Sequence, residues 1–351
     1  METVLMYGLF IVGLVLIIKG GDWFVDSASW IAEVLGVPKF VIGATIVSIA
    51  TTLPEMIVSI QATAKGNVDM AAGNAIGSVT ANTAMIMGLF IVCMPFAIKR
   101  KEFAPKACMM FGASALLMLG CIFTEKREMQ FAGETGMYYS LSTIGLIALI
   151  GVFIIFFIEN FISMKNNQVQ IEPSPENIGI QEEDNIVPTK EKATGKDWTK
   201  NLIFFALGAA GIVIGANLLV DKGTLIAQSL NVPQRLISVI AIAIGTSLPE
   251  LVTTITALRK KVGALSVGNI LGANIIDLAL ILPICSFVSM GKETGALAVS
   301  ANSVEIDMLV CLIAIAVAII PTIITQKFQR WQGIVMLAGY LAYVIFTVTM
   351  H

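Results

Sequence analysis

Stretches of about 20 apolar residues recur along the whole chain, and a helix of that length crosses the hydrocarbon core of a bilayer. Of the 351 residues, 13% are charged, against about 25% in a soluble domain. Because so few charges cannot cover a water-facing surface, most of the surface must meet lipid. We predict ten spans, at Val4–Ile18, Phe40–Ala64, Met70–Ala97, Ala104–Phe123, Met137–Ile162, Asn201–Leu219, Leu236–Leu258, Leu265–Met290, Val304–Thr325 and Trp331–Met350. The sixth span has a continuation beyond Leu219, and for the first a continuation past Gly20-Gly21 is the alternative.

Composition and motifs argue against several other classes of protein. The formal net charge of −2 gives no sign of a nucleic-acid partner. The only histidine is His351, and the five cysteines occur without a CxxC pair, so no zinc or iron–sulfur site is expected. Neither an HExxH motif nor a repeated aspartate-rich motif occurs, so we expect neither an enzyme nor a bound cofactor. No segment indicates a protein partner.

Residues 163–200 separate two groups of five predicted spans. The segment mixes charged residues with Pro173, Pro175 and Pro188 and contains no aromatic residue before Trp198. It cannot bury enough apolar area to offset chain entropy, so we predict a flexible linker, with a small regulatory element as the alternative. The chain then divides into a first membrane repeat at 1–162, a hydrophilic linker at 163–200 and a second membrane repeat at 201–351.

Basic residues predict the orientation. Loops close to a membrane carry more Lys and Arg on the cytoplasmic side. With an outside N-terminus and ten spans, the inside loops, Lys106 included, collect 16 of the 22 Lys and Arg residues. We therefore predict a multi-pass protein of the plasma (inner) membrane, with both termini outside and the linker in the cytoplasm.

The two halves of the chain align without a gap at an offset of 195 residues. The run TTLPE at 51–55 matches TSLPE at 246–250, and Gly73-Asn74 matches Gly268-Asn269. Asn82 falls opposite Asp277. Apolar similarity between membrane helices is common, but matching Pro-Glu and Gly-Asn pairs at one offset indicate a duplication.

Each copy holds five spans, an odd number, so the second copy is upside down relative to the first. We predict an all-α polytopic membrane protein with ten transmembrane helices in two inverted five-helix repeats. The matching motifs centre on residues 40–90 and 236–283. Inverted repeats are a transporter architecture, with the substrate site near mid-membrane where the copies meet.

A Pro-Glu pair lies about 15 residues into a predicted span in each copy. Proline donates no backbone hydrogen bond, so Pro54 frees the carbonyl of Ala50 and Pro249 frees that of Gly245. Glu55 and Glu250 follow, with hydroxyl side chains just before them. Carboxylates, carbonyls and hydroxyls are the oxygen ligands that hard cations require. The alternative is that each Pro-Glu pair marks a helix N-terminus at the membrane edge, where a glutamate favours the helix dipole.

The second matching cluster is GNAIGSVTAN at 73–82 and GNILGANIID at 268–277. Glycines four residues apart let another helix approach closely, and we assign only this packing role to Gly73, Gly77, Gly268 and Gly272. Asn74 and Asn269 are equally consistent with a site and with hydrogen bonds between helices. Asp277 is a third carboxyl inside a span, and an ionisable group at that depth is a functional candidate.

These two clusters resemble the α-repeats of the sodium/calcium exchanger, or cation/Ca²⁺ antiporter, superfamily, as in its prokaryotic members. GATIVSIATTLPE at 43–55 with GNAIGSVTAN looks like the first repeat, and AIAIGTSLPE at 241–250 with GNILGANIID looks like the second. The resemblance implies Na⁺/Ca²⁺ exchange by alternating access, with the first and sixth helices sliding past the rest. Transported cations and the lipid bilayer are then the expected partners.

The resemblance also implies a mid-membrane site with ligands from both repeats. Glu55 and Glu250 would ligate Ca²⁺ and, in the other state, Na⁺. The other implied ligands are Thr51 and Thr246 in the central site, Thr52, Ser247 and Ser78 at flanking Na⁺ positions, the carbonyls of Ser48 and Ala243, and Asn82 and Asp277 completing the centre.

The sequence departs from the family pattern at Ala273, where a serine is usual, and at Ser48, Ala50 and Thr52. These departures concern the sodium sites and the stoichiometry. Coupling to H⁺, or a K⁺ requirement associated with Asp277, is the nearest alternative. An ion channel is a further one, although carboxylates that bind a divalent ion tightly slow conduction.

Overall fold

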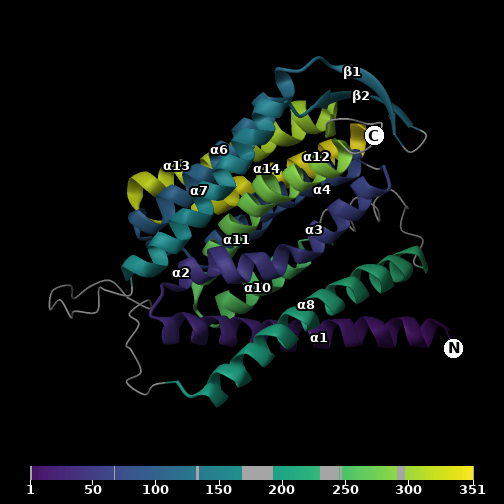
Figure 1. Ribbon diagram of the computed structural model, residues 1–351. Coiled ribbons are helices and arrows are strands. Elements are labelled where there is room, and N and C mark those ends of the chain that lie inside the picture. The colour runs from purple at the N-terminus through teal and green to yellow at the C-terminus, as the bar shows by residue number, and fades with distance from the viewer. Residues whose placement is uncertain are drawn as a thin grey trace.

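The computed structural model describes residues 2–66, 68–131, 134–167, 193–229, 245, 247–290 and 297–350. This part of the chain is mostly helical, and eight of its helical stretches are long and apolar enough to cross a bilayer (Figure 1). The prediction of a polytopic helical membrane protein is therefore confirmed. The number of ten spans stays a prediction, because residues 236–244 and 246 of the predicted span 236–258 lie outside the described residues.

The elements follow the predicted order, and several predicted spans contain a short π-helical segment, labelled η. The helical elements are α1 (Glu2–Leu35), α2 (Lys39–Ile42), η1 (Gly43–Val47), α3 (Ser48–Ala64), α4 (Val68–Thr80), η2 (Ala81–Met87), α5 (Gly88–Cys93), α6 (Arg100–Ile122), α7 (Thr143–Asn167), α8 (Gly195–Ser229), α10 (Leu248–Arg259), α11 (Gly263–Ile276), η3 (Asp277–Ile281), α12 (Leu282–Met290), η4 (Ser303–Asp307), α13 (Met308–Thr325) and α14 (Arg330–Met350).

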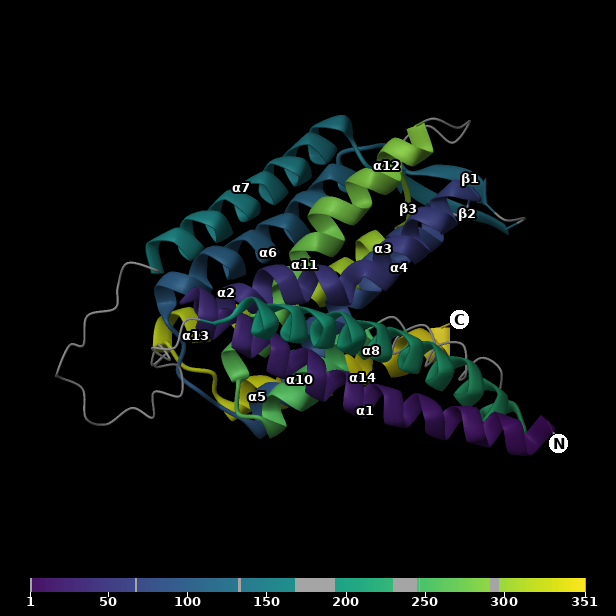
Figure 2. The ribbon, with the colours of Figure 1, turned by 60° about the horizontal axis from the view of Figure 1, so that its bottom comes forward.

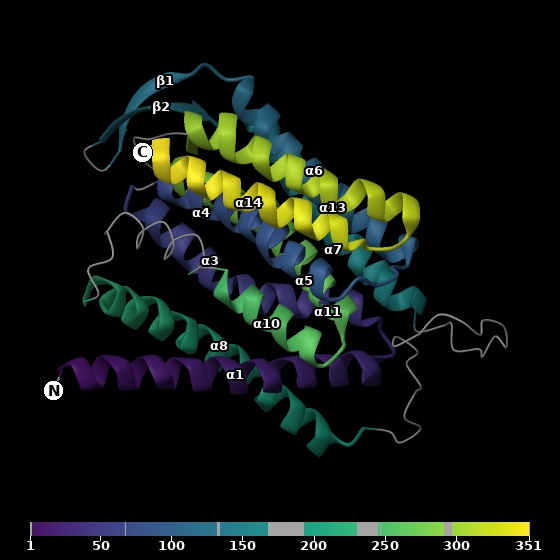
Figure 3. The same ribbon diagram turned by 180° about the vertical axis from the view of Figure 1, so that it is seen from behind.

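Two helices extend well beyond the apolar centres of their predicted spans and cross one another at one side of the bundle (Figures 1 and 3). They are α1, with 34 residues, and α8, with 35. A Cβ atom built at Gly20 would lie 2.9 Å from the carbonyl oxygen of Gly208, and one at Gly215 would lie 2.8 Å from that of Gly13. Glycine at these positions lets the two backbones touch. α1 and α8, one from each repeat, therefore form a tightly packed pair.

The start of α1, the end of α14 and the loop between α6 and α7 lie at one end of the bundle. The end of α7 and the start of α8 lie at the opposite end, as Figures 1 and 2 both show. This arrangement agrees with the relative sides that the basic residues predict for the termini and the linker. Residues 168–192, most of the predicted linker, lie outside the described residues.

The centre of the bundle is the span 263–290, in which 83% of the residues in an apolar 18-residue window are buried. Its first helix, α11, contacts α2, η1, α3, α6 and α10 (Figure 2). The packing role predicted for Gly268 and Gly272 is confirmed, because a Cβ at Gly268 would overlap the carbonyl oxygen of Phe40. For Gly73 and Gly77 no described residue comes within 4 Å of such a Cβ, so their packing role stays a prediction.

The Gly268 contact predicts a clear loss of stability for Gly268→Ala. The added methyl group overlaps backbone atoms that cannot rotate away, and overpacking of this kind costs about 1–3 kcal/mol. The melting temperature of the detergent-solubilised protein should fall by several degrees. Gly112→Ala is the matched control, because no described residue lies within 4 Å of its Cβ, so it should gain about 1 kcal/mol of helix propensity. Equal melting temperatures for the two variants would contradict the close contact.

The expectation of a purely α-helical chain is wrong at one end of the bundle. β1 (Arg127–Phe131) and β2 (Glu134–Ser140) form an antiparallel hairpin, and β3 (Ala298–Ser300) adds a third strand beside β2. Tyr139 of β2 lies opposite Val299 of β3. The sheet thus joins a loop of the first repeat to a segment of the second. No local sequence pattern predicts a pairing between segments so far apart.

One basic residue, Lys106, lies differently from the sequence interpretation. The sequence places Lys106 among the loop charges, but it is a fully buried residue of α6 and forms an ion pair with Glu159 of α7. Leaving it out of the inside set gives 16 − 1 = 15 basic residues, so the predicted orientation does not change. Asp22 and Asp26 of α1 form ion pairs with Lys260 at the end of α10.

Candidate cation site

Three carboxyl groups lie in the interior of the bundle, where water does not reach them. Glu55, Glu250 and Asp277 are each about 1% exposed. Both carboxyl oxygens of each glutamate and Oδ1 of Asp277 lack a hydrogen-bond partner among the described residues. Glu250 and Asp277 also lie close enough to Glu55 for their charges to act on it. Burying charges without partners is strongly unfavourable. A positive charge close to these carboxyl groups would therefore stabilise the cluster.

Glu55 lies in α3, and this helix runs through Pro54 without a break. The proline therefore removes one backbone hydrogen bond but does not end the helix. Directly before α3, the π-helical turn η1 packs against α11. Such turns are frequent at functional sites.

Glu250 lies in the first turn of α10, which begins at Leu248 with Pro249 next to it. The alternative interpretation of Pro-Glu as a helix start is thus correct for the position of Glu250 in its helix. The structure adds that Glu250 is buried among the other helices of the bundle. The helix N-terminus also favours a negative charge at this position.

Asn82 and Asp277 each lie in a π-helical turn, and the two turns occupy equivalent places in the two repeats. Asn82 lies in η2 and Asp277 is the first residue of η3. A π-helical turn widens the backbone and re-aims the side chains next to it. The repeats therefore share a local distortion where one has an amide and the other a carboxyl group.

A chain of hydrogen bonds joins the two repeats beside the glutamates. The Thr51 hydroxyl donates to Asn269 Oδ1 at 3.1 Å, and Asn269 Nδ2 donates to the Thr253 hydroxyl at 3.1 Å. The Thr253 hydroxyl in turn donates to the backbone carbonyl of Glu250 at 2.9 Å. Asn269 therefore connects α3 to α10 through α11. Asn74 likewise donates to Ser59 at 3.0 Å, so hydrogen bonding between helices is confirmed for both asparagines.

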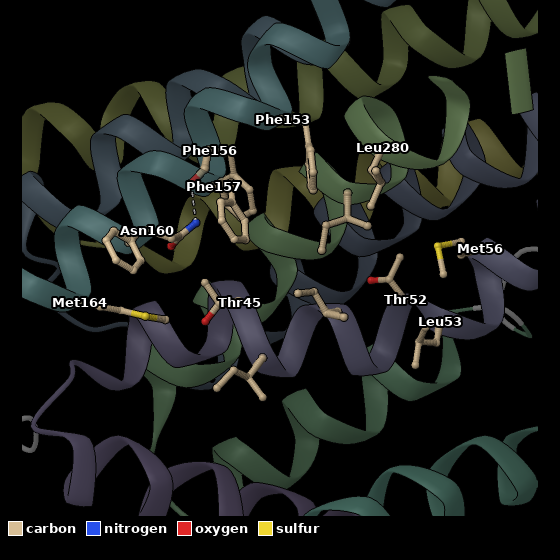
Figure 4. A pocket seen from close by; sticks show the side chains of 14 residues that line it. Thr45, Thr52, Leu53, Met56, Phe153, Phe156, Phe157, Asn160, Met164 and Leu280 are labelled. Carbon is tan, nitrogen blue, oxygen red and sulfur yellow. Dashed lines mark hydrogen bonds between the residues drawn. The ribbon is translucent and has the colours of Figure 1, made fainter. Parts of the chain in front are cut away.

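Ser48 and Thr52 are joined by a hydrogen bond within α3. The Thr52 hydroxyl donates to the Ser48 carbonyl at 2.6 Å, and the Thr51 hydroxyl lies 3.3 Å from the same oxygen. Thr52 also borders a cavity of about 350 Å³ between α3 and α7, where Phe153, Phe156 and Leu280 are among the lining residues (Figure 4). Since this cavity is walled mainly by apolar side chains, it is not a place for a cation.

The other predicted ligands differ in what the structure describes. Ser247 is buried and its hydroxyl has no hydrogen-bond partner among the described residues. Ser78 is buried in α4. Thr246 and Ala243 lie outside the described residues, so their predicted roles remain predictions.

The arrangement suits a cation that is held by few carboxylates and many neutral oxygens. Among the described residues, no three Asp, Glu, His or Cys side chains gather closely enough to hold a metal ion by themselves. Carboxylates from α3 and α10 would therefore share an ion with hydroxyl, amide and carbonyl oxygens. Ca²⁺ accepts six to eight such oxygen ligands in flexible geometry.

Comparison with known families agrees with this geometry. The family model described as "Sodium/calcium exchanger protein" matches residues 5–160 and 200–349, which include both glutamates and Asp277. This chain belongs to the sodium/calcium exchanger family. The unmatched residues 161–199 correspond closely to the predicted linker at 163–200.

Individual relatives align over nearly the whole chain. The sodium/calcium exchanger MaX1 of Methanosarcina acetivorans is 30% identical, with 95% of this chain and 96% of MaX1 covered. The uncharacterized membrane protein MJ0091 of Methanocaldococcus jannaschii is 29% identical over 96% of each chain. The structure of the sodium-calcium exchanger NCX_Mj soaked with 10 mM Na⁺ and zero Ca²⁺ superposes with a TM-score of 0.73. It is 27% identical and covers 97% of this chain and 98% of NCX_Mj.

Two residues beside the predicted ligands were missed by sequence reasoning. Thr253 closes the hydrogen-bond chain to the Glu250 carbonyl, and Asn274 contacts Asn82 across the repeats. Asn274 stands inside the GNILGANIID motif, where an amide in an otherwise apolar run was a usable signal. Thr253 follows Glu250 by three residues and so lies on the same helix face.

Proposed function

We propose that this chain exchanges Na⁺ for Ca²⁺ by alternating access around the cluster of Glu55, Glu250 and Asp277. The observation that carries the proposal is the burial of three carboxyl groups, from both halves of the chain, without hydrogen-bond partners for five of their oxygens among the described residues. The similarity to MaX1 and NCX_Mj over nearly the whole length supports it.

The coupling follows from charge. Carboxylates close together in a medium of low dielectric cannot all stay ionised without cations. One Ca²⁺ with a monovalent cation, or several Na⁺ ions, neutralise the three carboxylates. Without bound cations, moving the charged cluster from one side of the membrane to the other is unfavourable. Either kind of ion therefore crosses, but the empty carrier does not, which makes the two fluxes depend on each other.

The proposed architecture has ten transmembrane helices in two inverted repeats, with the site where the repeats meet. Thr51, Thr246, Thr52, Ser247, Ser78, Asn82 and the carbonyls of Ser48 and Ala243 complete the ligand set in this proposal. Both termini are outside the plasma membrane and the linker is cytoplasmic. The chain acts as a transporter and not as an enzyme.

The test is uptake of ⁴⁵Ca²⁺ into proteoliposomes with Na⁺, K⁺ and H⁺ gradients imposed one at a time. An outward Na⁺ gradient alone should drive accumulation, which should collapse when the gradient is dissipated. Accumulation driven by a pH gradient without Na⁺ would instead identify a proton-coupled antiporter. A calcium current far above carrier turnover would identify a channel.

A further inference from the structure

Asn274 is a buried amide of α11 that has no place in the ligand set above. It is 0% exposed, and its equivalent at the offset of 195 residues is the apolar Val79. Its side chain contacts three residues from two other elements: Asn82 and Thr83 in η2, and Met110 in α6. A buried amide with a full set of partners in a membrane interior is a candidate for a positioning role.

Hydrogen-bond chemistry fixes which way the Asn274 amide points. Its Nδ2 lies 3.2 Å from the Met110 sulfur and 2.9 Å from the Thr83 hydroxyl. A thioether sulfur only accepts hydrogen bonds, so the NH₂ group must face Met110. Oδ1 of Asn274 is then left facing Asn82.

The orientation of Asn274 in turn fixes that of Asn82. Asn274 Oδ1 accepts a hydrogen bond from Asn82 Nδ2 at 3.1 Å. If Asn82 turned over, two carbonyl oxygens would face each other. Asn82 therefore keeps its NH₂ group on Asn274 and points Oδ1 the other way. That oxygen is buried and has no hydrogen-bond partner among the described residues.

We propose that Asn274 is a positioning residue that holds Asn82 with its oxygen, and not its NH₂ group, available to a bound cation. A cation is attracted by an amide oxygen and repelled by an amide NH₂ group. The hydrogen bonds of Asn274 with Met110 and Asn82 thus determine whether Asn82 presents a ligand oxygen or a repelling NH₂ group to a cation. The proposal rests on the proposed cation site, but not on which ions are exchanged.

The test is the cation-induced rise in melting temperature of the detergent-solubilised protein, measured separately with Na⁺ and Ca²⁺. Any ligand that binds the folded state raises stability by mass action, so this readout needs no transport. Asn274→Leu should weaken cation binding about 10- to 100-fold, as loss of a positioning partner of a metal ligand does. It should do so without lowering the cation-free melting temperature by more than the control variant does.

Asn160→Leu is the matched control. Asn160 is also a buried asparagine with an unpartnered Oδ1 among the described residues, but it lies in α7 beside the apolar cavity. It should leave the cation-induced shift unchanged. Equal losses of cation response for both variants would indicate a general effect of deleting a buried amide, and would overturn the proposal.

A second background separates positioning from direct loss of structure. In Asn82→Asp both side-chain atoms are oxygens, so no orientation has to be maintained. Adding Asn274→Leu to Asn82→Asp should therefore not weaken the cation response further, because it also removes the Asn274 oxygen that the new carboxylate would face. An undiminished effect in that background would show that Asn274 does not act through Asn82. If the wild type binds cations in this assay but shows no Na⁺-driven Ca²⁺ uptake, the proposed exchange fails while the positioning role stands.

An independent observation concerns the ion pairs between the crossed helices and the rest of the bundle. Lys260, directly after α10, pairs with Asp26 of α1 at 2.7 Å. The offset of 195 residues relates Lys260 to Lys65, directly after α3, and Asp26 to Asp221 of α8. Each pair would link one crossed helix to the end of a helix that carries a site glutamate. Among the described ion pairs, however, Lys65 and Asp221 are not joined, and both are exposed.

We infer that these two pairs are alternating latches, of which Asp26–Lys260 is closed in this conformation and Lys65–Asp221 closes in the opposite one. In an inverted-repeat transporter each repeat takes up the conformation of the other when access changes sides. A contact made by one repeat is then made by its equivalent in the other state. This inference rests on the proposed inverted architecture.

Cross-linking tests the alternation directly. The protein would carry Asp26→Cys, Lys260→Cys, Lys65→Cys and Asp221→Cys together, with its five native cysteines replaced by serine. A short bismaleimide should link either pair in different molecules, and mass spectrometry of intact protein should find one link per molecule. Molecules carrying both links would overturn the inference, as would a complete absence of the 65–221 link. Link formation does not require Na⁺ or Ca²⁺ transport, so a failure of exchange would be distinguishable.

Discussion

Glu55→Gln and Glu250→Gln should each abolish Na⁺-driven Ca²⁺ uptake. Each change removes one negative charge from a fully desolvated cluster and replaces a carboxylate oxygen by an NH₂ group that repels cations. Loss of one partner of a desolvated charge pair costs about 2–5 kcal/mol. At 1.4 kcal/mol per decade, Ca²⁺ binding should weaken roughly 30- to 4,000-fold.

The measurement is ⁴⁵Ca²⁺ uptake into proteoliposomes matched for protein content. Glu305→Gln is the control, because that carboxyl group is 46% exposed and already paired with Lys126. The control should retain uptake close to that of the wild type. Uptake that survives either Glu55→Gln or Glu250→Gln would exclude the cluster as the transport site.

Asp277→Asn should change the ion requirement of exchange more than its rate. The wild-type cluster has three carboxyl groups, and the variant has two. In the proposed mechanism Ca²⁺ neutralises two of the three negative charges. The wild type then needs a further monovalent cation, which is Na⁺, K⁺ or H⁺. The variant has the same amide at position 277 as the first repeat has at Asn82. One Ca²⁺ then balances the two remaining negative charges without a further cation.

The measurement is Ca²⁺ flux while Na⁺, K⁺ and pH are varied in turn. The Na⁺ dependence of the variant should be less steep by about one ion, since one fewer charge needs neutralising. Its flux should also respond less to pH, because a proton no longer substitutes for a cation at this position. Asp307→Asn is the matched control, because Asp307 lies at the start of α13 and accepts a hydrogen bond from Tyr343 at 2.9 Å. An unchanged ion dependence for Asp277→Asn would remove this carboxyl group from the coupling mechanism.

Much of the fold follows from local sequence properties. An apolar stretch of about 20 residues has few alternatives to a membrane helix, because every backbone polar group must be satisfied within the lipid. Eight stretches of the described residues confirm this, although α1 and α8 extend well beyond the apolar centres of their predicted spans. The extensions contain charged residues such as Asp26 and Asp197, which a hydropathy criterion takes as an end. Packing between the two helices, through Gly20 and Gly208, continues the helix where hydropathy alone would stop it.

The candidate site was predictable for a different reason. A carboxyl group beside a proline, deep in an apolar span and repeated at a fixed offset, has few structural explanations. The duplication of TTLPE as TSLPE makes Glu55 and Glu250 equivalent positions of the two repeats, and Asp277 follows from the same alignment. The sequence by itself thus determined the class of protein, the membrane helices and the three carboxyl groups of the proposed site.

Only the tertiary structure decided how these groups are held. The contacts of Asn269 and Asn274 join helices separated by up to 218 positions in sequence, and the pairing of β2 with β3 likewise joins distant segments. Such contacts depend on the distances and directions of side chains on different helices, which no local pattern contains. The same limit applies to Lys106, whose burial depends on Glu159 and Phe40 arriving from two other helices. Residue type identified the carboxylates of the proposed cation site, and helix packing alone determined which neutral oxygens lie beside them.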